Sequence, residues 1–273
     1  MTTANPQASE VREPSRSTAR LYKAFSSSIP YVFSFMVLFV IWHIVSVYIM
    51  RSVLFPSPTV VAATAVKLIA DGTLISNAAS SLARIFAGFG IGVAIGVPIG
   101  LLIGSFRMVR RLVEPWTEFL RFIPPTAMIT VAVIWFGIGE ASKIFLIIYT
   151  TIFIVILSSA AGVASISPNK LRAARALGAN SRQLFFLVAF PATVPFILTG
   201  MRLSMANSFM TIVASEMIAA DSGLGVMIWN GRMFMLVDQI FTALVTLGLL
   251  GFAADRLFRY GIFKFAGKYE PVA

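Results

Sequence analysis

Long apolar stretches, separated by shorter polar ones, occupy most of this chain of 273 residues. A helix needs about 20 mostly apolar residues to cross the roughly 30 Å of hydrocarbon in a membrane. The stretches predict six such spans: Tyr31–Met50, Ile85–Gly104, Phe122–Phe136, Ile144–Val163, Val194–Met217 and Val237–Ala254. The third and fifth are less regular, because Pro124-Pro125 interrupts the third and Arg202 and Glu216 lie in the fifth.

Polar segments divide the chain into three parts. Residues 1–29 are polar and predict a flexible tail, 30–263 form a membrane domain, and 264–273 form a second, short tail. Within the membrane domain, Pro58–Asp71 has the apolar spacing of a short helix, which we expect on the outer surface. A polar loop, 164–191, separates the fourth and fifth spans.

The distribution of Lys and Arg predicts the orientation, because cytoplasmic loops of membrane proteins carry an excess of both. If the N-terminus lies inside, 15 of the 22 basic residues fall in inner segments and four in outer ones. The inner set is Arg12, Arg16, Arg20, Lys23, Arg107, Arg110, Arg111, Lys170, Arg172, Arg175, Arg182, Arg256, Arg259, Lys264 and Lys268, and the outer set is Arg51, Lys67, Lys143 and Arg232. We therefore expect both termini in the cytoplasm.

The composition also favours lipid as the solvent. Apolar residues make up 58% of the chain, charged residues only 12%, and the mean hydropathy is +0.87. A soluble core of this size could not bury so much apolar surface, which excludes a soluble enzyme, a nucleic-acid-binding domain and a disordered chain. The net charge of +11 would suggest nucleic acid in a soluble protein, but the basic cytoplasmic loops account for it here.

Residues for catalysis or cofactor binding are scarce. The chain has no Cys and one His, His43, which we expect to pack or to make a local hydrogen bond. No His, Asp and Glu residues have metal-ligand spacing. A phosphate-binding loop is also absent: in the one Gly-Lys pair, Gly267-Lys268, Ile262 occupies the place of the first glycine. We therefore expect a transport protein that binds no cofactor itself rather than an enzyme.

Three charged residues inside predicted spans are candidates for a translocation pathway: Arg121, Arg202 and Glu216. A charge at the centre of a span costs at least about 2.5–3.5 kcal/mol against lipid, so each needs protein, water or substrate beside it. Arg202 and Glu216 lie about 21 Å apart along one helix and cannot pair. Our hypothesis is that Arg121 or Arg202 supplies positive potential for an anionic solute; alternatively, each arginine pairs with an acid on another helix or reaches the head groups.

Glycines recur at every fourth position of the second span, at Gly88, Gly92, Gly96, Gly100 and Gly104. Such a row forms a smooth ridge against which another helix can pack closely. We expect a helix-packing surface here, with a dimer or gate surface as the alternative.

The inner loop contains two predicted amphipathic helices. Pro168 and Asn169 open the first, Gly178 ends it, and the second runs from about Ser181 to Ala189 and is ended by Pro191. The small face of the first helix suits docking into a partner's groove. The alternative is a loop that rests on lipid head groups.

This loop carries a specific pattern over 20 positions. Arg172-Ala173-Ala174 is followed by three residues, Gly178, nine residues, and then Val188-Ala189-Phe190-Pro191. The pattern resembles the coupling loop of ABC-importer permeases, in which E-A-A is followed at the same spacing by Gly and by I-x-L-P. Arg172 stands where the family commonly has Glu, which bears on any polar contact that the Glu makes with the ATPase.

Further short motifs extend the resemblance over most of 54–263 and are similar to those of nitrate, sulfonate, taurine and bicarbonate permeases. They are Leu54-Phe55-Pro56-Ser57-Pro58, Phe122-Ile123-Pro124-Pro125, Trp135-Phe136-Gly137-Ile138-Gly139-Glu140, Leu198-Thr199-Gly200-Met201-Arg202-Leu203 and Ser222-Gly223-Leu224-Gly225.

The resemblance implies an all-α permease with the type I ABC importer fold, in the inner membrane of a bacterium. It implies that two such subunits, expected to be identical, form the pathway, that two cytoplasmic ATPases bind ATP and Mg²⁺, and that an external binding protein delivers a small anion. Arg172, Ala173, Ala174, Gly178 and Pro191 would then contact the ATPase and couple ATP hydrolysis to alternating access.

Two other functions stay open at this point. A small secondary transporter or channel would need no ATPase, and the inner loop would be only a linker. A scaffold protein would anchor an ATPase without transporting anything. The sequence does not identify the transported solute.

Overall fold

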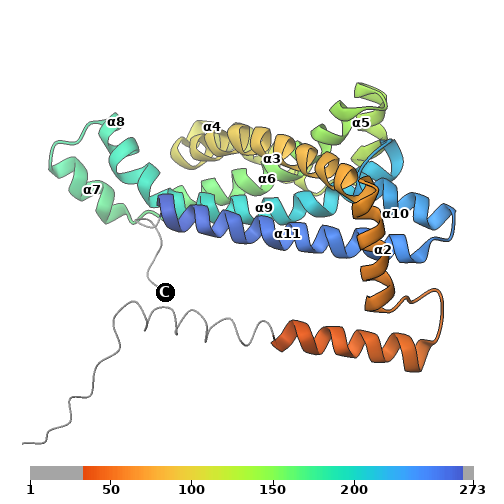
Figure 1. Ribbon diagram of the computed structural model, residues 1–273. Coiled ribbons are helices and arrows are strands. Elements are labelled where there is room, and N and C mark those ends of the chain that lie inside the picture. Colours follow the sequence, from red (N-terminus) through yellow and green to blue (C-terminus); the bar gives the residue numbers. More distant parts are fainter. Residues whose placement is uncertain (1–32, 267–273) are drawn as a thin grey trace, which may run out of the picture. The chain divides into compact units, whose positions relative to one another are not determined.

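The computed structural model describes residues 33–266 (Figure 1). The predicted tail 1–29 and the residues 267–273 of the second tail, with Gly267-Lys268, lie outside the described residues. The chain divides into two units, one up to Val60 and one from Val61 onwards. Every regular element in 33–266 is a helix.

The first unit contains one long helix, Phe33–Met50, which is apolar enough to cross a membrane and ends in the π-helical segment η1 (Val45–Met50). The following loop folds back on this helix: Trp42 Nε1 donates a hydrogen bond to the Pro56 carbonyl at 3.1 Å, and Ser46 Oγ donates to the Phe55 carbonyl at 2.6 Å. These bonds satisfy polar groups that lipid could not, and they fix the start of the next helix, α2 (Pro58–Ala70).

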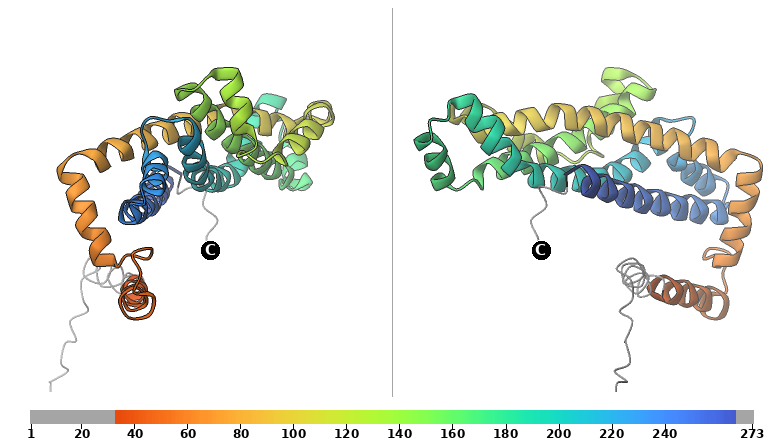
Figure 2. Two further views of the ribbon diagram at one scale, coloured as in Figure 1. Left: turned by 90° about the vertical axis from the view of Figure 1, so that its right-hand side faces the viewer. Right: turned by 60° about the vertical axis from the view of Figure 1, so that its left-hand side comes forward.

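In the second unit the helices are α3 (Thr73–Ser105), α4 (Arg107–Arg121), α5 (Met128–Phe136), α6 (Glu140–Ala164), α7 (Pro168–Ala176), α8 (Ser181–Gln183), η2 (Leu184–Ala189), α9 (Phe190–Ala219), α10 (Leu224–Met233) and α11 (Val237–Ala266). The long helices α3, α6, α9 and α11 run side by side (Figures 1 and 2). The short helices α7 and α8 lie at one end of them, and α5 and α10 at the other.

The glycine row of α3 faces α6 along its whole length. A Cβ added at Gly88 would lie 2.6 Å from the Cβ of Ile147, and one at Gly100 would lie 2.5 Å from the carbonyl oxygen of Ile156. Gly92, Gly96 and Gly104 would meet α6 in the same way. Only glycine lets the two backbones approach this closely, so the row sets the distance between α3 and α6.

Beside this contact lies the main apolar core. It joins Ile85 and Phe89 of α3 to Ile147 of α6 and to Phe209 and Ile212 of α9. A second cluster holds α10 and α11 to the beginning of the unit: Leu224, Met227 and Ala243 pack with Leu68 and Leu74. Together the clusters hold the four long helices and α10 as one packed unit.

The third predicted span differs from the structure. Residues 122–127 form a turn, and helix α5 has only nine residues, so 122–136 is not a single long helix. Pro124 and Pro125 lack backbone N–H groups and prevent a continuous helix. Instead the amphipathic α4 and the apolar α5 follow each other along the bundle, with the turn between them (Figure 1). Five helices among the described residues are long and apolar enough to span a membrane.

The prediction that Pro191 ends the second loop helix is wrong. Helix runs without interruption from Ser181 to Ile218, and Pro191 lies in it. The π-helical segment η2 precedes Pro191, and its different hydrogen-bond spacing accommodates a proline that has no N–H to donate. The inner loop therefore passes directly into the long helix α9.

Candidate coupling surface and buried charges

The turn at Gly178 gives the inner loop its shape. Its φ is +83°, a left-handed conformation that favours glycine. Gly178 N–H donates to the Arg175 carbonyl at 2.9 Å and Ala179 N–H to the Ala174 carbonyl at 3.1 Å, which is the Schellman pattern of a helix end. Helix α7 therefore ends where the sequence predicted, and the chain reverses sharply into α8.

Helix α8 begins with a complete capping box. The Asn180 side chain accepts from Gln183 N–H at 2.9 Å, and the Gln183 side chain accepts from Asn180 N–H at 2.8 Å. Because α8 continues through η2 into α9, this cap sets the direction in which α9 leaves the turn. The turn and α9 are thus joined by one uninterrupted run of helix.

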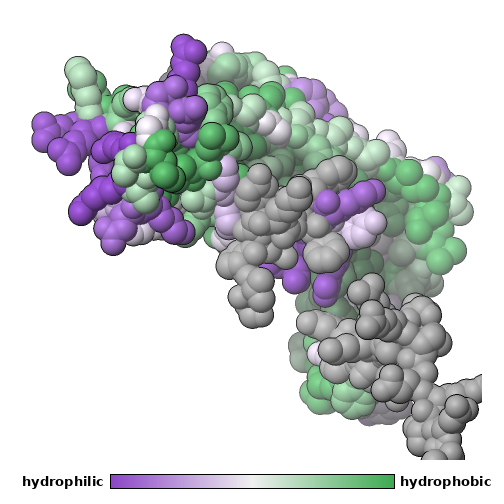
Figure 3. Space-filling view, turned by 90° about the vertical axis from the view of Figure 1, so that its left-hand side faces the viewer, coloured by the Kyte–Doolittle hydropathy of each residue, from purple (hydrophilic) through white to green (hydrophobic). Residues whose placement is uncertain are grey.

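The solvent-facing surface of this loop is open to contact with another protein. No residue of α7 is buried, and Leu177 is 89% exposed at its tip. Phe186 and Leu187 of η2 are also exposed, while Arg172 and Arg175 lie on α7. Figure 3 views this end and shows hydrophilic side chains around a hydrophobic patch. Arg172, Ala173 and Gly178 are exposed, Ala174 is half-buried, and Pro191 is half-buried in the first turn of α9.

Glu216 is 1% exposed and lies in a cluster of charges at the opposite end of the bundle. Arg84 of α3 donates to it at 2.7 Å, and Ser81 and the Gly225 N–H donate at 2.9 Å. Arg84 also forms two bonds to Glu140, of 2.6 and 2.8 Å, and Lys143 donates to Glu140 at 3.0 Å. Two cations and two carboxylates thus balance in one network.

The same network holds the loop between α9 and α10. Arg84 donates to the Ser222 carbonyl at 2.6 Å, the Asn77 side chain accepts from Gly223 N–H at 2.7 Å, and Ser81 Oγ accepts from Leu224 N–H at 2.9 Å. The N-terminus of α10 is therefore attached to one face of α3. The Glu216 carboxylate lies at this N-terminus, where the helix dipole favours a negative charge.

Arg84 is the functional candidate that sequence reasoning missed. It lies one residue before the apolar stretch that defined the second span, and the helix begins eleven residues earlier at Thr73. The spacing of Asn77, Ser81 and Arg84 places three polar side chains on one helical face, which was the available signal. The partner that Ser81 and Arg84 share, Glu216 on α9, could not be derived from that spacing.

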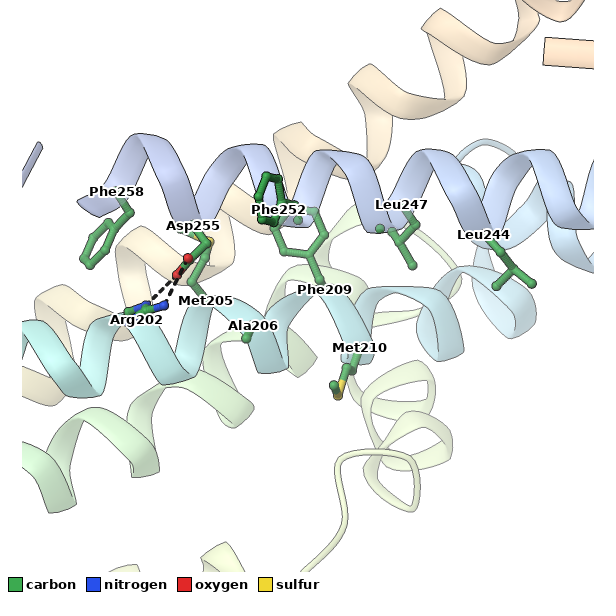
Figure 4. Close-up of a pocket in the computed structure, with 12 residues that line it drawn as sticks. Arg202, Met205, Ala206, Phe209, Met210, Leu244, Leu247, Phe252, Asp255 and Phe258 are labelled. Atoms are coloured by element: carbon green, nitrogen blue, oxygen red, sulfur yellow. Dashed lines mark hydrogen bonds and ion pairs between the residues drawn. The ribbon is translucent and has the colours of Figure 1, made fainter. Parts of the chain in front are cut away.

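Arg202 has the partner that the alternative interpretation required. Its Nε and Nη2 donate to the two carboxylate oxygens of Asp255 on α11, at 2.5 and 3.1 Å. The pair closes one end of a groove of about 320 Å³ between α9 and α11, lined mainly by apolar side chains such as Phe209, Met210 and Leu244 (Figure 4). Such a bidentate pair largely neutralises the charge of Arg202.

Arg121, at the end of α4, is less well neutralised. The Glu118 carboxylate, on the same helix, lies 3.9 Å from its Nη2, and the guanidinium lies over the Phe122 ring with 4.8 Å to the centroid. Its side chain is 36% exposed. The roles of Arg121, Arg202 and Glu216 in a pathway stay predictions, and the structure separates them into three different surroundings.

Metal binding finds no support in the part of the chain that the structure describes, where no three His, Asp or Glu side chains are grouped as ligands.

The chain is similar to known membrane transport proteins. Residues 96–262 match the family described as binding-protein-dependent transport system inner membrane component. A probable ABC transporter permease protein of Brucella melitensis is 39% identical over 206 residues, which cover 76% of this chain and 84% of that protein.

Named transport systems appear among the relatives. The taurine transport system permease protein TauC of Escherichia coli is 37% identical over 186 residues, 68% of this chain and 67% of its own. The putative aliphatic sulfonates transport permease protein SsuC of Escherichia coli is 36% identical over 200 residues, 73% of this chain and 76% of its own.

Among solved structures, an inward facing conformation of the MetNI methionine ABC transporter superposes with a TM-score of 0.58. Sequence identity is 22%, and the alignment covers 69% of this chain and 95% of that one. At this identity the likeness concerns the fold alone.

Proposed function

Because the chain belongs to the family of binding-protein-dependent transport system inner membrane components, we propose that it forms half of the membrane pathway of an ATP-driven importer for a small anion. Its membership makes it a permease component of the inner membrane, with the fold of an ABC importer permease. The number of subunits, the ATPase and the solute are the parts that we add.

The observation that carries the proposal is the exposed turn at Gly178. A loop that only linked two spans would gain nothing from a well-defined turn that presents Leu177 to solvent. An exposed apolar tip on such a turn is typical of a docking surface. We infer that Ala173, Ala174 and Gly178 enter a groove of a cytoplasmic ATPase, with Arg172 at its rim and Pro191 at the base of α9.

The coupling mechanism follows from the chain connectivity. Helix α7 follows the end of α6, and α8 leads without a break into α9, so the loop is held at both sides by long helices of the bundle. Closure of two ATPases on ATP and Mg²⁺ would move this loop and tilt α6 and α9 together. The permease itself holds neither ATP nor Mg²⁺ in this proposal, and two identical permease subunits enclose the pathway.

An anionic solute is supported by the relatives that are named for taurine and aliphatic sulfonates. Nitrate belongs to the same chemical class. An external binding protein would select among them.

Crosslinking tests the docking surface directly, because the chain has no native Cys. The variant Leu177→Cys should crosslink to the cognate ATPase subunit through a short thiol-amine reagent. Leu54→Cys is the matched control: its leucine is 62% exposed and lies in a segment that we expect on the outer side. Equal crosslinking of both variants, or none at Leu177→Cys in a complex that transports, contradicts the proposal.

A further inference from the structure

A second cavity lies beside the break between α4 and α5. It has a volume of about 320 Å³ and is lined by Arg121, by the turn that contains Pro125, by Thr150 and Phe153 of α6, and by Asn207 of α9. Ligand sites of this kind are mostly apolar, measure about 300–1,000 Å³ and contain a few polar groups that fix the orientation of the ligand. The cavity meets this description.

The cavity lies beside the end of α4 and part-way along α6. Arg121 is 14 residues from the start of α4, about 21 Å at 1.5 Å per residue, and Thr150 is ten residues, about 15 Å, from the start of α6. The cavity therefore lies where α4 ends, away from the starts of both α4 and α6.

The charge at the cavity is positive and poorly neutralised. The carboxylate of Glu118 is 56% exposed and 3.9 Å away, so its pairing with Arg121 is weak. Arg202, in contrast, donates to both carboxylate oxygens of Asp255, so its positive charge is largely neutralised. This difference selects Arg121 from the two arginines that the sequence proposed for an anion pathway.

Neighbouring groups cover two carbonyl oxygens that would repel an anion. The Tyr149 hydroxyl donates to the Leu120 carbonyl at 2.6 Å and lies 3.4 Å from the Ile123 carbonyl, so these negative ends of peptide dipoles are occupied. The Phe122 ring supports the guanidinium from one side. Asn207 donates to the Leu203 carbonyl through Nδ2 and shares the cavity with Thr150.

We propose that this cavity is a transient binding site for the anionic group of the transported solute, a sulfonate or nitrate, and that Arg121 attracts that group during its passage. The inference rests on the proposed function. It identifies the place where the charge of the solute is compensated after the binding protein has released it.

Charge-selective labelling tests the site without knowledge of the solute. In the assembled complex, Asn207→Cys is modified by two water-soluble thiosulfonate reagents, one carrying a sulfonate and one a trimethylammonium group. The ratio of the two rates reports the potential at the cavity. We expect Arg121→Gln to lower the anion-to-cation ratio at least about tenfold, because a unit charge within a few ångströms changes both rates in opposite directions.

Two control variants accompany Arg121→Gln. Glu118→Gln should raise the ratio, since it removes the weak counter-charge. The double variant Arg202→Gln/Asp255→Asn removes a neutral ion pair and should leave the ratio within about twofold. An unchanged ratio in Arg121→Gln overturns the inference, and so does a cysteine at 207 that neither reagent reaches during turnover.

Uptake of labelled taurine, ethanesulfonate and nitrate by the same complex separates the two proposals. If the native complex imports none of these three solutes, each of which carries an anionic group, while it imports a solute without one, the proposed function fails. If it imports one of them and Arg121→Gln does so at the native rate, the function stands and the inference about the cavity fails. We expect Arg121→Gln to lose at least about tenfold in uptake and Arg121→Lys to recover part of it, because lysine retains the charge but not the planar donor pair.

Discussion

Removal of Arg84 is predicted to be the most destabilising single substitution at the end of the bundle where α10 lies. In Arg84→Met, Glu216 keeps the hydrogen bonds from Ser81 and Gly225 but has no cation within reach. Both side chains are buried, with 6% and 0% exposure of the side chain. Breaking a buried pair by removing one partner costs about 3–5 kcal/mol, because an uncompensated charge stays inside.

Removal of the carboxylate should cost less. In Glu216→Gln, Arg84 still donates twice to Glu140, whose side chain is 59% exposed and reaches water. The loss is then mainly that of charge-assisted hydrogen bonds, about 1–3 kcal/mol. The double variant Arg84→Met/Glu216→Gln leaves Glu140 with Lys143 and contains no buried unpaired charge. Its cost should therefore fall short of the sum of the two single costs by about 2 kcal/mol or more.

The assay is unfolding of the purified permease in detergent, with SDS as denaturant and tryptophan fluorescence as the signal, since the chain has four Trp. Arg182→Met is the matched control: this arginine is exposed on α8, and its removal should change the free energy of unfolding by less than about 0.5 kcal/mol. Amide exchange adds a local readout, because the N–H groups of Gly223, Leu224 and Gly225 are bonded into the same network.

Two results would refute this reasoning. A loss of less than about 1 kcal/mol in the free energy of unfolding of Arg84→Met would mean that Glu216 becomes hydrated or pairs with another group at little energetic cost. Additive single and double costs would mean that Arg84 and Glu216 do not interact, and that the helices hold together through apolar packing alone.

Three further predictions concern other parts of the fold. Gly100→Ala should destabilise the bundle by about 1–3 kcal/mol in the same unfolding assay, because the added Cβ would collide with the Ile156 carbonyl oxygen. Gly90→Ala is the control and should be neutral or stabilising, because the space around Gly90 is open; equal effects of the two substitutions would contradict the α3–α6 contact. Gly178→Leu should distort the turn, because a residue with a side chain pays roughly 1–2 kcal/mol to adopt this left-handed backbone conformation. The amount of solute imported per ATP hydrolysed should fall at least several-fold; full uptake at normal ATP use would show that the loop does not couple ATP hydrolysis to transport. Tyr149→Phe removes the donor at the Leu120 carbonyl and should destabilise the end of α4 by about 0.5–1.5 kcal/mol, seen as faster amide exchange in 118–123; unchanged exchange would show that the hydroxyl does not hold this turn.

The sequence predicted most of the helical arrangement because lipid imposes a simple rule on composition. Apolar length alone placed the helix Phe33–Met50 and the helices that contain Ile85–Gly104 and Ile144–Val163. It could not give their full lengths, since a helix can continue beyond the apolar stretch, as α3 does from Thr73. It also could not decide how Pro124-Pro125 and Pro191 would be accommodated: the first pair ends a helix, whereas the π-helical segment η2 lets the second continue.

Partners of the charged side chains were the part that the sequence could not supply. Arg202 and Asp255 are 53 positions apart and Arg84 and Glu216 are 132 apart, so only the packing of α3, α9 and α11 brings them together. The four-residue spacing of the glycines predicted a packing ridge, but not that α6 would be the helix packed on it. Gly178 was different, because a local helix end depends on local residues and its position was predictable.

The central claim is that this permease moves its solute only when an ATPase drives the inner loop. The most direct measurement uses proteoliposomes that contain the permease with its ATPase, with binding protein and labelled solute outside and ATP and Mg²⁺ enclosed. We predict uptake that requires enclosed ATP and that stops with an ATPase variant unable to hydrolyse it. Uptake that continues without ATP and follows an imposed ion gradient would contradict the claim and identify a secondary transporter or channel.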